Sequence, residues 1–428
     1  MEVTVTPKKE TSQAEISITV SAHDFKPYLE KAAKKLSTDN TIKGFRPGKA
    51  PVATVAEMFG GDKLLHEAMD MALPYFFVQA ALDQGIEAIN RPAITVEELG
   101  FDTPFRFTAV VDVLPEVTLP ALKTIKAEKR EVKVEDGVVE KELKHLAKMR
   151  STYLEVARPA KDGDVVTVDF TVKMDGVVME GGTSKNHPIT IGEGAFVPDF
   201  EKGLLGISAK DKRNYPIAFP DDFANESLRS KQAEVEVEVH SVQERLVPEL
   251  NDEFAKKVGK FESLQNLKDE LTKNMKEELE HKEQDRFQGD LAEQLADKST
   301  FGFIPPILVE KEIDARLEEM AQMLAYQGKT MDEYMNTQKK TLADMRSDIK
   351  DAATKNVKVG LAMRAFAAEH EVEATEEEIE ERATRQMAMY KDIPEAQAKI
   401  NLDELKERVG STIRNQKVLQ KLAELAGK

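Results

Sequence analysis

The sequence contains no cysteine, which excludes disulfides, thiolate metal sites and cysteine nucleophiles. It also lacks any run approaching the roughly 18 apolar residues of a membrane-spanning helix, and no long apolar stretch follows the first charges as in a signal peptide. The net charge of −17 argues against general affinity for nucleic acids or membranes, so any basic patch has to be local. We therefore expect a soluble, cytoplasmic protein with no membrane partner.

The motifs of common enzyme classes are missing as well. The seven histidines lie far apart and do not have metal-ligand spacing. The chain has neither a G-x-x-x-x-G-K-S/T phosphate loop nor a G-x-S-x-G nucleophile elbow, and GEGAFVP at 192–198 does not fit the dinucleotide-binding pattern. We therefore expect no metal and no cofactor, and kinase, hydrolase and oxidoreductase functions are disfavoured.

The length of 428 residues allows roughly two to four domains, and the first is predicted over 1–111. Alternating apolar residues predict a strand over 15–21, and apolar residues at helical spacing predict a following helix capped by Asp24. Pro51 is predicted as the first residue of the next helix. A longer helix that stops at Gly85 precedes another strand, so this domain is α+β.

After residue 111 the pattern of apolar and polar residues changes from one segment to the next. Residues 112–150 run from an extended segment into a charged helix. Within 151–245, two alternating runs flank Asp175 and Gly176, a pair typical of a tight hairpin turn, and a later strand alternates Val with Glu. This segment is predicted to be a small, mostly β domain. From 246 to 428 the pattern is helical almost without break.

Two apolar stripes mark the helical part, and packing within the chain is their favoured role. They consist of Ile313, Leu317, Met320 and Leu324, and of Leu402, Leu405, Val409 and Ile413. Thr375 and Glu378 form a capping box ahead of another helix. The predicted fold class is thus α+β and multidomain, with an α+β N-terminal domain, a small β+α domain and an all-α C-terminal domain.

The stretch KGFRPGKAP at 43–51 is a first candidate site. Between Lys26 and Lys49 the chain carries seven basic and two acidic side chains, a local charge of +5. If the lysines of the preceding helix share its outer face, helix and loop form one positive spot. There Arg46 can pair phosphates or carboxylates, and Phe45 offers an apolar or stacking surface. From composition alone, a solvated turn shaped by Gly and Pro is an equally good interpretation.

A second candidate site lies in the β domain, where aromatic and apolar residues recur beside glycine-rich turns. These residues are Phe170, Phe196, Val197, Phe200 and Phe223. They fit either the lining of an apolar cleft or a core, and the pattern alone favours the core.

Three features in order along the chain resemble the trigger factor family of bacterial ribosome-associated chaperones, over essentially its whole length. Residues 151–245 resemble a prolyl isomerase domain of the FK506-binding-protein (FKBP) type. Segments at 247–259 and 303–313 resemble markers of the family's helical C-terminal domain. The family's ribosome-docking loop, G-F-R-x-G-x-x-P, is matched by GFRPGKAP, whose candidate binding residues are Gly44, Phe45, Arg46, Gly48, Lys49 and Pro51.

The resemblance implies docking beside the exit tunnel of the large ribosomal subunit, on a ribosomal protein and nearby rRNA phosphates. Phe45 and Arg46 are the chief docking residues. Many members have Lys after this Arg, so Pro47 removes a charge and stiffens the loop, and Lys49 compensates for the charge. The resemblance also implies arm-like C-terminal helices around a cradle for nascent and unfolded polypeptides, a homodimer off the ribosome, and a link to the cell cycle and cell division.

The methionines fit a promiscuous surface. Flexible thioether chains re-pack against varied apolar partners, although the same residues are equally suited to a core. Nine of the sixteen lie in the C-terminal part: Met275, Met320, Met323, Met331, Met335, Met345, Met363, Met387 and Met389.

The isomerase resemblance assigns a set of cleft positions. An apolar cleft favours the twisted amide of an Xaa-Pro bond without any acid, base or nucleophile. Met179, His187 and Val235 stand where Phe is common, which predicts a weakened isomerase with an altered preference for the residue before proline. The assigned positions are Phe170, Met179, Glu180, His187, Phe196, Val197, Phe200, Phe223 and Val235.

Two other functions compete with a ribosome-bound chaperone. One is a free prolyl isomerase with a helical dimerisation domain, and the other is an RNA-binding protein. The net charge of −17 disfavours RNA binding. The specificity of the loop at 44–51 favours the chaperone, with isomerase activity as a subsidiary function.

Overall fold

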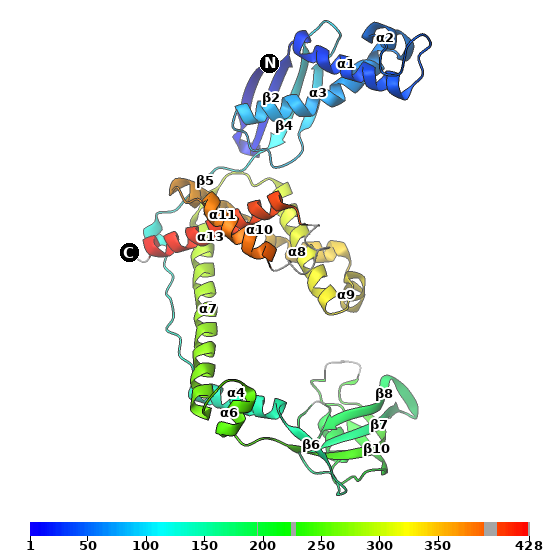
Figure 1. Cartoon of the computed structure of the whole chain (residues 1–428), viewed down its shortest axis with the longest axis vertical. Helices are drawn as coiled ribbons and strands as arrows, with labels where there is room; N and C mark the ends of the chain where they lie inside the picture. The colour runs from blue at the N-terminus through cyan, green and yellow to red at the C-terminus, as the bar shows by residue number, and fades with distance from the viewer. Residues whose placement is uncertain (195, 224–227, 389–399, 427–428) are drawn as a thin grey trace. The chain divides into compact units, whose positions relative to one another are not determined.

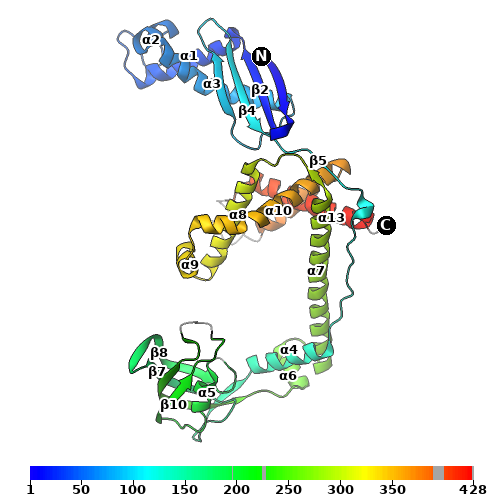
Figure 2. The same cartoon turned by 180° about the vertical axis from the view of Figure 1, so that it is seen from behind.

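The computed structural model describes residues 1–194, 196–223, 228–388 and 400–426, without the side chains of Asp136 and Glu180 (Figures 1 and 2). The chain divides into two compact units. One consists of Met1–Lys129 and Gln284–Lys428, and the other of Arg130–Glu283. The boundary falls within helix α7 (Leu264–Lys298), so this helix contributes residues to both units.

The amino-terminal part of the first unit is built on a four-stranded antiparallel sheet with strand order β1-β2-β4-β3. Helices α1 (Ala22–Asp39) and α3 (Gly61–Asp83) cover one face of this sheet (Figure 1), and α2 (Val52–Phe59) links them in the chain. The strands are β1 (Glu2–Lys8), β2 (Gln13–Val20), β3 (Ala93–Glu98) and β4 (Phe105–Asp112).

Two predicted helix starts are wrong, and one predicted helix stop is confirmed. Ser21 rather than Asp24 is the N-cap of α1, because the Ser21 hydroxyl accepts a hydrogen bond from the Asp24 N–H at 3.1 Å. Pro51 is the N-cap of α2 rather than its first residue, since its ψ of 153° is extended. The stop at Gly85 is confirmed by its φ of 63° and by the bond from its N–H to the Leu82 carbonyl.

The second unit contains a five-stranded antiparallel sheet with the order β6-β10-β7-β8, in which β9 also pairs with β10. The predicted hairpin is confirmed, because Met174 pairs with Val177 around Asp175 and Gly176, whose φ angles are 50° and 80°. The elements are β6 (Thr152–Glu155), β7 (Val165–Met174), β8 (Val177–Thr190), the short helix α5 (Pro198–Gly203), β9 (Lys212–Ala218) and β10 (Gln232–Leu246).

Helix α4 (Asp136–Met149) packs in this same unit against α6 (Asp252–Val258) and the first part of α7. Leu143, Phe254 and Leu267 are buried where the three helices meet. The charged helix predicted here ends at Met149, and the residues after it extend into the sheet as β6, where they pair with β10.

Helices dominate the described remainder of the first unit. The predicted packing of both apolar stripes is confirmed, because Ile313, Leu317, Leu405 and Val409 are buried, whereas Leu402 at one stripe's end is exposed. The elements after α7 are α8 (Pro306–Tyr326), α9 (Met331–Gln338), α10 (Leu342–Glu369), α11 (Glu376–Ala388) and α13 (Leu402–Ala426), with a short ladder between β5 (Val117–Thr118) and β11 (Thr300–Phe301).

The capping box and the methionines of this helical part are also resolved. The Thr375 N–H donates to the Glu378 carboxylate at 2.8 Å, and the Glu378 N–H donates back to the Thr375 hydroxyl at 3.3 Å, which confirms the box. Met345 and Met363 are buried and Met323 is exposed. The other C-terminal methionines are partly buried, except Met389, which lies outside the described residues. Most of these methionines therefore pack within the chain.

Candidate functional site

An apolar cleft of about 550 Å³ opens beside β7, β9 and α5. Its described lining contains no ionisable side chain. The lining consists of Phe170, Val172, Met179, Gly181, Gly182, Gly194, Phe196, Val197, Pro198, Phe200, Ile217, Phe219, Pro220, Phe223 and Leu228. The aromatic and apolar residues that pattern alone placed in a core thus border a cleft.

Four rings form one contiguous aromatic cluster beside the cleft. Phe200 on α5 is 1% exposed and stacks on Phe196, with ring centroids 4.9 Å apart and planes 21° apart. Phe170 on β7 stands edge-on to both rings, at 5.3 and 5.7 Å. His187 on β8 meets Phe170 and Phe196 edge-on at 5.9 and 5.5 Å. Such edge-on and stacked pairs hold each ring in place.

Not all nine predicted cleft residues lie at the cleft. Val235 is fully buried in the core on β10, where it pairs with Val172, and His187 contacts the rings from the side without lining the cleft. The side chain of Glu180 is outside the described residues. Those that line the cleft are Phe170, Met179, Phe196, Val197, Phe200 and Phe223.

Sequence reasoning missed the side of the cleft formed by β9 and the turn after it. Ile217, Phe219 and Pro220 line this side. The alternation of Ile217 and Phe219 signals one face of a strand. It does not signal that this face borders a cavity instead of the core.

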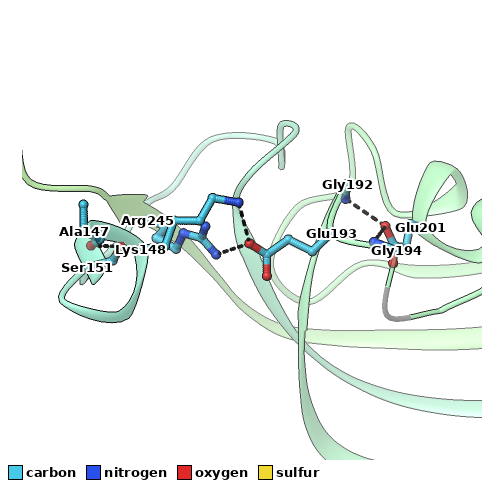
Figure 3. Close-up of polar contacts among 8 residues, drawn as sticks. All are labelled: Ala147, Lys148, Ser151, Gly192, Glu193, Gly194, Glu201 and Arg245. Atoms are coloured by element: carbon cyan, nitrogen blue, oxygen red, sulfur yellow. Dashed lines mark hydrogen bonds and ion pairs between the residues drawn. The ribbon is translucent and has the colours of Figure 1, made fainter. Parts of the chain in front are cut away.

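Sequence reasoning also missed Glu201, whose carboxylate holds the backbone of Gly192, Gly194 and Phe196. The side chain is 5% exposed and accepts three backbone hydrogen bonds. The N–H groups of Gly192 and Gly194 donate to it at 2.9 and 3.2 Å (Figure 3), and the N–H of Phe196 donates at 3.0 Å. Because Glu201 follows Phe200 in α5, one short helix fixes both stacked rings of the cleft.

Tyr215 on β9 supports α5 from the other side. Its hydroxyl donates to the Phe200 carbonyl at 2.9 Å, and a Cβ on Gly203 would lie 2.1 Å from its ring. Burial raises the pKa of Tyr215 well above its usual value, so the phenol stays protonated and keeps donating this bond. Tyr215 therefore fixes the backbone under Phe200.

The loop that carries GFRPGKAP begins with a tight turn at the end of α1. The Phe45 N–H donates to the Ile42 carbonyl at 3.2 Å, and Gly44 has a φ of 90° at the third position of the turn. This is the position at which a type II turn requires a positive φ. Ile42 is buried, so the turn is attached to the core at its start.

A second turn of the same kind follows at once. The Lys49 N–H donates to the Arg46 carbonyl at 3.0 Å, with Pro47 at the second position and Gly48 at the third, where φ is 76°. The Gly48 N–H donates to the Ser37 carbonyl at 3.1 Å, which fastens the turn to α1. The second position of such a turn favours proline, so Pro47 fits the fold of the loop.

The two turns present the candidate docking side chains to solvent. Phe45 is 40% exposed although it is a large apolar residue, and Arg46 and Lys49 are exposed beside it. Ile42 and Ala50 are buried at the two ends. The loop is therefore a small, anchored tip with an aromatic ring and three cations, Lys43 included.

The lysines of α1 do not form the single positive face that the sequence suggested. Lys35 pairs with Glu67 on α3, and this hydrogen bond raises the pKa of Lys35. The Lys31 ammonium lies 4.9 Å from the centre of the Tyr28 ring. Lys34 adjoins the loop, with its Cγ 3.6 Å from where a Cβ on residue 48 would be. The positive spot is thus smaller than the local charge implies.

Two negative findings hold for residues 1–194, 196–223, 228–388 and 400–426. No group of three or more His, Cys, Asp and Glu in them is arranged to hold a metal ion. None of the helices described is long and apolar enough to cross a membrane.

Comparison with known proteins identifies the family. The family model described as bacterial trigger factor protein matches residues 1–146, and that for the trigger factor C-terminus matches 263–424. The chain is 32% identical over 402 residues to the trigger factor of Caldicellulosiruptor bescii, covering 94% of this chain and 90% of that one. The chain belongs to the trigger factor family.

Further relatives agree with this membership. The trigger factor of Shouchella clausii is 35% identical over 386 residues, covering 90% of this chain and 88% of its own. A solved structure of the trigger factor chaperone, from work on its promiscuous substrate recognition in folding and assembly, has a TM-score of 0.51. It covers 99% of both chains at 23% identity, which supports the fold. The predicted multidomain α+β fold class is confirmed.

Family membership also gives the general function. Trigger factors are ribosome-associated chaperones, and an FKBP-type peptidyl-prolyl cis-trans isomerase model matches residues 156–240, which contain the cleft. The chain is therefore a ribosome-associated chaperone with a prolyl isomerase domain. The trigger factor matches on both sides of the isomerase domain favour this function over a free isomerase with a helical dimerisation domain.

Proposed function

We propose that Phe45 and Arg46 attach this chain to the large ribosomal subunit beside the exit tunnel. The observation that carries the proposal is the exposure of Phe45 at the tip of two rigid turns. An exposed ring on a pre-formed turn binds without a large loss of conformational entropy. Arg46 can form paired hydrogen bonds with a carboxylate of a ribosomal protein or with an rRNA phosphate. Lys49 supplies a second cation in place of the lysine that Pro47 replaces.

Co-sedimentation with bacterial ribosomes tests this attachment. Full-length Phe45→Ala/Arg46→Ala is expected to stay in the supernatant while the wild type pellets. The control is Tyr75→Ala/Lys63→Ala, which removes an exposed ring and a cation from α3 in the same domain. Equal pelleting of the loop variant and the wild type, with circular dichroism confirming that both are folded, contradicts the proposal.

The cleft is the proposed isomerase site. An Xaa-Pro bond crosses a barrier of about 18–20 kcal/mol, and twisting it removes resonance and charge separation. A cleft whose described lining contains no ionisable side chain stabilises that less polar twisted amide relative to the planar one. Phe200 and Phe170 bind the proline ring, and the stacked Phe196 closes one wall. Each 1.36 kcal/mol of preference for the twisted form increases the rate about tenfold.

The activity is proposed to be weakened, because Met179 and His187 stand at positions where the resemblance to FKBP-type isomerases leads us to expect Phe. An imidazole beside Phe170 is more polar than a phenyl ring, and it lies 3.4 Å from the Ser184 hydroxyl. The test is a protease-free peptide assay with the full chain. Relaxation of an Xaa-Pro peptide no faster than the uncatalysed rate contradicts the isomerase proposal and leaves the ribosome proposal standing.

The other proposed roles follow the same division of the chain: docking by 1–111, a linking helix in 112–150, isomerisation by 151–245 and chaperoning by 246–428. Nascent and unfolded polypeptides are the proposed clients of the helical part, where Tyr326 is 95% exposed.

We place the protein in the cytoplasm and propose a homodimer off the ribosome, which sedimentation velocity would detect. The link to the cell cycle and cell division stays a prediction.

A further inference from the structure

The loop residues Gly192, Glu193 and Gly194 are held from two opposite sides (Figure 3). On their inner side the Glu201 carboxylate accepts backbone hydrogen bonds from the two glycines. On their outer side the carboxylate of Glu193 accepts hydrogen bonds from the Arg245 guanidinium at 2.8 Å and from the Lys148 ammonium at 3.4 Å. The inner contacts belong to the cleft, whereas the proposed isomerase mechanism makes no use of the outer ones.

The two outer partners come from different elements. Arg245 lies near the carboxyl end of β10 and is 10% exposed, so its charge is largely removed from water. Lys148 lies in the last turn of α4, a helix whose apolar side packs on α6 and α7 and not on the isomerase sheet. The Ser151 hydroxyl donates to the Ala147 carbonyl at the end of this helix. Glu193 therefore joins the cleft loop to a helix outside the isomerase fold.

The geometry of the loop allows a change at Glu193 to alter the wall of the cleft. Glu193 is three residues before Phe196, whose ring stacks on Phe200. Gly192 and Gly194 on either side of it have φ angles of 87° and 74°. These left-handed conformations fix the turn in which Glu193 points outward while Phe196 points to the cleft. A displacement of Glu193 is thus transmitted through the Glu201 carboxylate, which accepts hydrogen bonds from the N–H groups of Gly192 and Gly194 and from that of Phe196 at the cleft wall.

The ion pair has enough strength to influence the loop. The hydrogen bond from Arg245 is the largest cause that holds the pKa of Glu193 below its usual value, and Lys148 adds to it. The Glu193 side chain is 39% exposed, so its pairs are discounted for screening by solvent. Removing these pairs is then expected to change the equilibrium constant of a step coupled to the loop, such as peptide binding in the cleft, by about threefold, which is measurable.

We propose that Glu193 is a positioning residue that couples helix α4 to the cleft wall at Phe196, so that peptide binding by the isomerase depends on Lys148 and Arg245. The inference rests on the proposed function of the cleft. Coupling is reciprocal: a proline-containing segment in the cleft biases the position of α4, and a force on α4 changes affinity for that segment. The isomerase site of this chaperone is thereby linked to its helical framework.

A double-mutant cycle in the full chain tests the coupling. The variants are Glu193→Gln, Lys148→Met and both together, and the control is Glu155→Gln, an exposed glutamate on β6 of the same unit. Steady-state isomerisation of an Xaa-Pro peptide is measured at low and high ionic strength. Glu193→Gln is expected to raise KM about threefold with little change in kcat, because the pair positions the wall without taking part in twisting the bond.

The pattern across the cycle decides the proposal. Lys148→Met is expected to raise KM in the wild type but to have no further effect in the Glu193→Gln background. High salt is expected to raise the wild-type KM toward the variant value, because it screens the pairs. An unchanged KM in Glu193→Gln, or equal effects of Lys148→Met in both backgrounds, overturns the coupling.

Failure of catalysis itself is distinguishable from failure of the coupling. If the wild type does not accelerate the peptide, the proposed isomerase function fails. Hydrogen–deuterium exchange of the peptide spanning 190–200 then decides the coupling. Faster exchange in Glu193→Gln than in Glu155→Gln supports it, and equal exchange overturns it.

Discussion

Replacing Glu201 is expected to release the loop that forms one wall of the cleft. In Glu201→Gln the side chain keeps its shape but retains one acceptor oxygen, and its NH2 group faces at least one backbone N–H. At least one of the three hydrogen bonds is therefore lost. A hydrogen bond to a charged group contributes about 1.5–3 kcal/mol, so we expect a loss of about 2 kcal/mol in the stability of the loop.

Amide exchange measures this loss directly. A change of about 2 kcal/mol in local opening corresponds to about 30-fold faster exchange of the Gly192, Gly194 and Phe196 amides. Hydrogen–deuterium exchange of the full chain should show the change in that segment, while the sheet around β10 keeps its protection. The control is Glu234→Gln, an exposed position on β10. Unchanged exchange in Glu201→Gln would refute the anchoring role of the carboxylate.

Three further predictions concern other parts of the molecule. Burial alone would raise the pKa of Asp164, but hydrogen bonds from Arg158 at 2.6 and 3.2 Å and from a backbone N–H outweigh it and hold this pKa below its usual value. Asp164→Asn should cost about 2 kcal/mol at neutral pH, and its melting temperature should converge with that of the wild type as pH falls from about 4, the usual aspartate pKa, through the lower pKa of the folded protein. Gly48→Ala should weaken ribosome binding more than Gly44→Ala in an equilibrium titration, because both have a positive φ but only residue 48 would place its Cβ 2.8 Å from a hydroxyl oxygen of α1. His187→Phe should raise kcat/KM for an Xaa-Pro peptide by about tenfold or less, since it removes a polar ring beside the aromatic cluster, and a fall in kcat/KM would contradict the weakened-isomerase proposal.

Hydrophobic periodicity was sufficient to predict the elements that have one buried face. β2 alternates fully between buried and half-buried residues, and in β10 the buried Val235, Val237 and Val239 alternate with half-buried glutamates. β1 and β3 were missed because their side chains are exposed or half-buried on both faces. The N-cap of α1 was misassigned because Ser21 and Asp24 are both favoured cap residues, and backbone geometry decides between them.

The candidate sites, too, could be predicted only in part from the sequence. The Gly and Pro residues of the docking loop encode its two turns locally, so a tight loop was predictable from the sequence. The pairing of Lys35 with Glu67 was not, because these residues are 32 positions apart. Likewise, Phe200 and Val235 are equally apolar and equally buried, and three-dimensional placement alone shows that Phe200 borders the cleft.

The role of Glu201 could not be predicted from the sequence, and the reason is physical. An acidic residue in a short helix is ordinarily exposed, and its partners here are backbone N–H groups, which leave no signature in the sequence. The same holds for Tyr215, whose partner is a backbone carbonyl. Positioning residues of this kind emerge when the hydrogen bonds of buried polar groups are followed one by one.

Site-specific photo-crosslinking tests ribosome docking most directly. A benzophenone amino acid is placed at Phe45, and at Val177 in the exposed β7–β8 hairpin as the control, and each full-length protein is irradiated with vacant ribosomes. We predict a crosslink from position 45 to a protein of the large subunit and none from position 177. Equal labelling from both positions, or labelling of the small subunit alone from position 45, would contradict docking through this loop.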